Sequence, residues 1–74
     1  MKPIKNRHPV ITDLTTSRRN LGLSQEELSD RMGYARGNLS TYELGRSAPN
    51  MRFLTTWAQA LGFDITLKPR DDDK

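Results

Sequence analysis

Four glycines divide the middle of this chain into short segments and so limit what it can fold into. Gly22, Gly33, Gly45 and Gly62 each follow a stretch in which apolar residues recur at intervals of three or four. Because glycine readily adopts the left-handed conformation that commonly ends a helix, each is predicted to stop one. The expected fold class is therefore all-α, with four to five short helices within residues 9–62.

The second of these segments carries the clearest local signal. Ser24 is a favourable N-cap, Glu27 stands three residues later where the carboxylate of a capping box belongs, and Leu23 can pack onto Leu28. These residues predict a helix of two turns that runs to Met32 and ends at the following glycine.

The other helices are predicted from apolar spacing. The first is expected to begin at Pro9 or Thr12, the third to span residues 36–44, and the fourth to follow Asn50 as its N-cap. Their predicted apolar faces consist of Val10, Leu14 and Leu21 in the first, Leu39 and Tyr42 in the third, and Met51, Leu54, Trp57, Ala58 and Leu61 in the fourth.

The period of the pattern changes to two after the last of these helices. Phe63, Ile65 and Leu67 alternate with polar residues until Pro69, which predicts a short β-strand over residues 63–68. A lone strand in a helical chain leaves its backbone groups unpaired. We therefore expect these three apolar residues to form a dimer contact with the same strand of a second copy.

The remaining segments complete the expected domain organisation. Residues 1–8 are polar and basic and are predicted to form a flexible arm, residues 9–62 form one domain, and residues 69–74 are predicted to be a disordered tail. With 74 residues and 34% hydrophobic content, the chain has material for only one small core. Help from a partner subunit is therefore expected.

Charge and residue types narrow the function classes. The net charge is +3, and it is +5 without residues 71–74, which suits a polyanionic partner such as nucleic acid. There is no cysteine, and the one histidine is His8, so we expect no metal, no cofactor and no enzyme activity. No apolar run is long enough to cross a membrane, and the protein is predicted to be soluble and cytoplasmic.

Several short stretches, taken together, match a known pattern. Their apolar positions, turn glycines and polar residues all fall at the spacing of that pattern, without a gap. The stretches are residues 22–28, 32–33, 39–46, 58–62 and Pro49. At this spacing the chain resembles the XRE family of helix-turn-helix proteins, to which the phage lambda repressor and Cro belong. The resemblance runs from Leu14 to Gly62, about two thirds of the chain.

The resemblance implies a lambda-repressor-like bundle in which the helix at residues 36–44 enters the major groove of DNA. Gly37 falls where many relatives carry a polar base-contacting residue, so this position is expected to be silent or to allow close approach of the backbone. The base-contacting residues implied by the resemblance are Arg36, Asn38, Ser40 and Thr41.

Further roles follow from the same resemblance. Arg18 is expected to form a structural ion pair with Glu43, which ties the first helix to the third and keeps this carboxylate from repelling DNA. Phosphate contacts are expected from Gln25, Arg46, Arg52, the backbone amide of Phe53, and Arg19.

The resulting prediction is a homodimeric repressor that binds double-stranded DNA at a palindromic operator and is associated with the nucleoid. Two alternatives remain open. One is an antitoxin that neutralises a toxin protein and represses its own operon, and the other is a protein-binding adaptor that has kept the fold and lost DNA contact.

Overall fold

A computed structural model describes residues 8–66 of the chain, so the predictions for residues 1–7 and 67–74 lie outside the described residues. The described part contains four helices and no strand, and the all-α prediction is confirmed. None of these helices combines the length and the apolar character needed to cross a bilayer. The helices are α1 (Pro9–Asn20), α2 (Gln25–Met32), α3 (Arg36–Glu43) and α4 (Met51–Ala60).

Every helix ends at a glycine, as predicted. The glycines that follow α1, α2, α3 and α4 have φ angles of 74°, 79°, 77° and 91°. After α1, the Gly22 N–H donates to the Arg19 carbonyl and the Leu23 N–H donates to the Arg18 carbonyl, at 2.9 and 3.1 Å. This is the Schellman arrangement, which satisfies carbonyls that the helix leaves free and turns the chain within two residues.

Side chains cap the beginnings of three helices. In α2, the Ser24 hydroxyl accepts the Glu27 N–H at 3.0 Å, and the Glu27 carboxylate accepts the Ser24 N–H at 2.8 Å, which confirms the capping box. Hydrogen bonding to Ser24 lowers the pKa of Glu27. The bond from the Ser24 backbone has the larger effect, and the bond with the Ser24 side chain has the smaller one. Asn50 caps α4 as predicted, and His8 Nδ1 accepts the Val10 N–H at the start of α1.

The first turn of α3 is the exception, because Ala35 occupies its N-cap position and makes no side-chain cap. We expect Ala35→Ser to raise the free energy of unfolding by about 0.5–2 kcal/mol, because a serine hydroxyl can accept a free N–H of this turn. Urea unfolding followed by Trp57 fluorescence measures the change. Ala48→Ser, at an exposed loop position, is the matched control, and an equal effect of the two substitutions would contradict the prediction.

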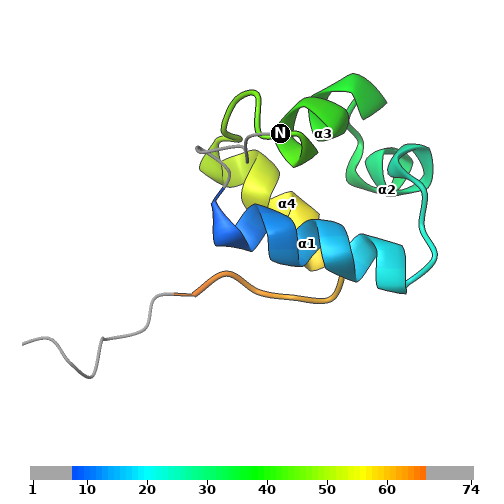
Figure 1. Cartoon of the computed structure of the whole chain (residues 1–74). Coiled ribbons are helices and arrows are strands. Elements are labelled where there is room, and N and C mark those ends of the chain that lie inside the picture. Colours follow the sequence, from blue (N-terminus) through cyan, green and yellow to red (C-terminus); the bar gives the residue numbers. More distant parts are fainter. Residues whose placement is uncertain (1–7, 67–74) are drawn as a thin grey trace, which may run out of the picture.

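The helices enclose one hydrophobic core. Helix α2 packs against α3 and α4, and α1 packs against α3 (Figure 1). Trp57 is completely buried at its centre, as predicted. The buried apolar residues are Ile11, Leu14, Leu28, Met32, Leu39, Phe53, Trp57, Ala58 and Leu61.

Two residues assigned to the apolar faces are exposed, whereas Val10, Tyr42 and Leu54 are partly buried against the core. Leu21 is 59% exposed and Met51 is 64% exposed, so their predicted burial is wrong. Leu21 is the residue after the last one of α1, and Met51 is the first residue of α4. Both residues stand at the ends of helices, whereas Ile11, which the apolar spacing did not single out, is buried in the first turn of α1.

An aromatic cluster connects α3 to α4. The ring centroid of Phe53 lies 4.4 Å from that of Tyr34, 4.7 Å from that of Tyr42 and 5.9 Å from that of Trp57. Tilted and edge-on pairs at such distances stabilise beyond the area that they bury. Since Tyr34 lies in the turn between α2 and α3, the cluster holds both ends of α3 against α4.

The strand predicted for residues 63–68 is not present in its described part, residues 63–66. The Phe63 N–H donates to the Ala58 carbonyl at 2.8 Å, so this residue completes the end of α4 instead. The following chain runs past α1 (Figure 1), and Ile65 packs against the core. A strand requires hydrogen bonds to a neighbouring strand, and a helix offers none. Leu67 lies outside the described residues.

Candidate nucleic-acid interface

Helix α3 has one buried side and one open side. Leu39 and Glu43, four residues apart, are 0% and 5% exposed and face the rest of the domain. With about 100° of rotation per residue, Gly37 and Thr41 lie on the opposite side. Two of the four residues predicted to contact bases are exposed, Arg36 and Asn38. The other two, Ser40 and Thr41, are partly exposed.

A buried ion pair holds α3 against α1. Arg18 Nε donates to Glu43 Oε2 at 2.8 Å, and Arg18 Nη2 donates to Glu43 Oε1 at 3.1 Å. The third donor of Arg18, Nη1, donates to the Leu23 carbonyl in the turn between α1 and α2 at 2.7 Å. The structure thus brings together the two residues expected to pair, in the bidentate geometry that suits arginine and a carboxylate. The carboxylate of Glu43 is thus buried and paired with a positive charge, on the side of α3 that faces α1.

Gln25, the first residue of α2, joins the same group of side chains. Its Nε2 donates to Glu43 Oε1 at 2.8 Å, so the start of α2 is tied to the end of α3. A side-chain amide has two N–H donors, and the second one is left for another acceptor. This bond was not predictable from the sequence, because the two residues are separated by 18 positions and no local pattern connects them.

The charge around the start of α2 is mixed. Glu26 and Glu27 lie in its first turn and are both exposed. Their carboxylates reduce the positive field that a helix N-terminus offers to an anion. A phosphate at this helix end therefore depends on the amide of Gln25 more than on the helix dipole.

The remaining candidates for phosphate contact are spread over α1, the loop after α3, and α4. Three of them are exposed arginines. Arg19 lies near the end of α1, Arg46 lies just after α3, and Arg52 lies in the first turn of α4. The side chain of Phe53 is only 3% exposed, and its N–H donates to Asn50 Oδ1 at 2.8 Å. A phosphate contact by this amide would compete with the cap of α4, so the three arginines have the more accessible donors.

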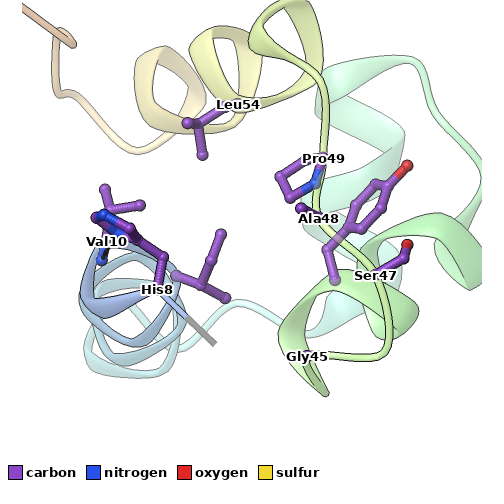
Figure 2. Close-up of a pocket in the computed structure, with 9 residues that line it drawn as sticks. His8, Val10, Gly45, Ser47, Ala48, Pro49 and Leu54 are labelled. Carbon is purple, nitrogen blue, oxygen red and sulfur yellow. Dashed lines mark hydrogen bonds between the residues drawn. The ribbon is translucent and has the colours of Figure 1, made fainter. Parts of the chain in front are cut away.

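A hydrophobic pocket of about 220 Å³ lies elsewhere, between the start of α1, the loop after α3, and Leu54 of α4 (Figure 2). None of the residues that line it was predicted to contact DNA. His8 is at its edge, and its Nδ1 already accepts the Val10 N–H. Within residues 8–66 no cluster of histidine and acidic side chains is arranged to hold a metal ion.

Comparison with known proteins agrees with this architecture. A sequence model of the helix-turn-helix family matches residues 16–68. An uncharacterised HTH-type transcriptional regulator of Methanothermobacter thermautotrophicus is 42% identical over 45 residues, which cover 61% of this chain and 65% of the relative. An uncharacterised HTH-type transcriptional regulator of Sinorhizobium fredii is 47% identical over 45 residues, which cover 61% of this chain and 58% of that relative.

The matched region therefore spans less than two thirds of either relative. The family match itself covers well over half of this chain and includes α2, α3 and α4 entirely. It agrees with the family prediction made from the turn glycines, the capping box and the apolar spacing. The protein belongs to the XRE-type helix-turn-helix family.

Proposed function

We propose that this protein is a DNA-binding transcriptional regulator that places α3 in the major groove. The observation that carries the proposal is the way in which α3 is held by α1 and α4. The inner side of α3 is fixed by a buried ion pair to α1 and an aromatic cluster to α4, while Arg36 in its first turn is exposed and its polar residues are exposed or partly exposed. Both relatives are named as transcriptional regulators, which supports this function over an enzyme.

Base recognition is assigned to the first turn of α3 and to the polar residues that follow it. Arg36 is its first residue and is exposed, and a guanidinium can donate to O6 and N7 of a guanine together. Asn38 can pair with an adenine in the same way. Ser40 and Thr41 follow one turn later and offer hydroxyls to either kind of base edge.

Phosphate binding is assigned to side chains around this helix. Gln25 has one amide N–H held by Glu43, which orients the other N–H for a phosphate oxygen. Arg46, Arg52 and Arg19 supply exposed positive charge, with the Phe53 amide as a further donor if its cap opens. Such contacts set the position of the protein on DNA without selecting a sequence.

Arg52→Ala is expected to weaken binding to all DNA sequences alike and to reduce the slope of log K against log salt by about 1, because one phosphate contact is lost. Fluorescence anisotropy titrations between low and physiological salt measure the slope. Arg31→Ala removes an exposed arginine from the far end of α2 and is the matched control. An unchanged slope for Arg52→Ala would remove this residue from the phosphate-binding set.

The proposed assembly is a homodimer on an operator with two-fold symmetry, with half-sites about 34 Å apart. Phe63 is 50% exposed although it is a large apolar residue, and it lies on the segment that passes α1. This supports a contact with a second copy through Phe63, and the proposed contact also includes Ile65, which is partly buried, and Leu67. Repression follows from occupation of a promoter by the dimer.

A second candidate is an antitoxin that also represses its own operon. Leu44, at the end of α3, is 44% exposed and provides apolar surface for a protein partner in addition to Phe63. Copurification of one stoichiometric toxin protein from the native host would favour this candidate. An adaptor with the same fold would be distinguished by the absence of any DNA binding.

Selection of bound DNA from a random pool at physiological salt tests the proposed function. Enriched sites with two-fold symmetry and half-sites one helical turn apart are the expected result. Recovery of no enriched sequence, with binding that disappears at physiological salt, would contradict a sequence-specific regulator.

A further inference from the structure

Gly37 differs from every other glycine in this chain. The sequence contains five glycines, and the four that follow helices have positive φ angles, which explains why glycine occupies those positions. Gly37 is the second residue of α3 and has no such angle. A backbone requirement for glycine is therefore absent at this position.

Packing does not require glycine there either. A Cβ atom built on Gly37 would meet no atom of the described part of the chain within 4 Å, and the residue is exposed. Glycine inside a helix costs about 0.5–1 kcal/mol relative to alanine. The preceding N-cap, Ala35, also leaves this turn without a side-chain cap. The turn is thus less stable than it could be, and nothing within residues 8–66 is gained in return.

An external molecule can supply the reason. Gly37 lies on the side of α3 opposite the buried Leu39 and Glu43, and Thr41 follows it one turn later on the same side. This is the open side of the helix that the proposed function places in the major groove. A turn without a side chain can approach the base edges more closely than any other turn of that helix.

We infer that Gly37 is a specificity-determining residue, and that the space left by its missing side chain receives the C5-methyl group of a thymine. The methyl group is the one apolar group that projects into the major groove, and it can fill this space without a hydrogen-bond partner. The methyl group of Thr41 supplies a second apolar contact beside it. A cytosine at this place has no methyl group and would leave the space beside Gly37 unfilled.

This inference rests on the proposed function and adds a base preference to it. The thymine is expected next to the guanine assigned to Arg36, because the two residues are adjacent in the first turn of α3. Each half-site of the operator should therefore contain a thymine whose methyl group, and not only its hydrogen-bonding edge, contributes to binding.

The test compares Gly37→Ala with the wild-type protein on the operator obtained by selection. Gly37→Ala is expected to unfold at a higher urea concentration and yet to bind this operator about tenfold more weakly, because its added methyl group occupies the space of the thymine methyl. Replacing the critical thymine by deoxyuridine, which removes only the methyl group, is expected to weaken wild-type binding about fourfold. The same replacement should have little effect on binding by Gly37→Ala.

The outcomes separate this inference from the proposed function. If an operator is selected and Gly37→Ala binds it as tightly as the wild type, the inference is wrong and the proposed function stands. Equal wild-type affinity for thymine and deoxyuridine at every half-site position would also overturn it. If no operator is enriched from the pool, the proposed function fails first, and the assignment of Gly37 fails with it.

Discussion

Glu43→Ala is expected to lower the free energy of unfolding by about 3–5 kcal/mol, which is most of the stability of a domain of this size. Arg18 would keep its bond to the Leu23 carbonyl but lose both bonds to the carboxylate, and its charge would remain buried and unpaired. Gln25 would lose its link to α3 as well. Urea unfolding followed by the fluorescence of Trp57, the single tryptophan, gives the measurement.

Two control variants separate charge from packing. Arg18→Met combined with Glu43→Leu removes both charges and keeps apolar volume, and it is expected to be far closer to the wild type than Glu43→Ala. Glu26→Ala removes an exposed carboxylate and should change stability by less than about 0.5 kcal/mol. A loss below about 1 kcal/mol for Glu43→Ala would mean that the ion pair does not hold α3 in place.

Arg36→Ala is expected to weaken binding to the selected operator by about 5- to 150-fold, which corresponds to about 1–3 kcal/mol. Since this arginine is exposed at the start of α3, its removal should leave the stability of the domain nearly unchanged. The loss should be confined to cognate DNA and should relax the preference at one base pair. Competition titrations with single-base operator variants measure both effects.

Arg36→Lys tests the geometry of this contact, because lysine keeps the charge and lacks the planar pair of donors. It should recover only part of the affinity lost in Arg36→Ala. Arg31→Ala, at an exposed arginine of α2 outside the proposed interface, accounts for the change in net charge. An equal loss for Arg36→Ala on cognate and random DNA would show that the residue contacts phosphate only.

The helices and their ends were predictable from the sequence because the interactions that define them are local. The Ser24 capping box, the Asn50 cap and the glycine ends each join residues no more than five positions apart. The positions of Leu28 and Trp57 in the core followed from the same short-range periodicity. Family resemblance then assigned roles to Arg36 and its neighbours, which the local pattern alone could not do.

The candidate site was predictable as a set of residues but not as a network. Gln25 was predicted to contact phosphate and Glu43 to pair with Arg18, and the structure joins all three side chains. Phe53 was considered for its amide, yet its ring packs among three other aromatic rings. These contacts depend on how α1, α2, α3 and α4 are packed, and helical periodicity contains no information on that packing.

Local sequence was therefore sufficient to predict where each helix begins and ends, because helix caps and glycine turns involve only residues that are close together in the chain. Which apolar residues are buried depended on the packing of helices far apart in the chain. Leu21 and Met51 follow the apolar pattern and yet are exposed at the end of α1 and the start of α4. Phe63 follows a strand pattern and instead closes α4, because its backbone N–H finds an acceptor at Ala58 and no neighbouring strand.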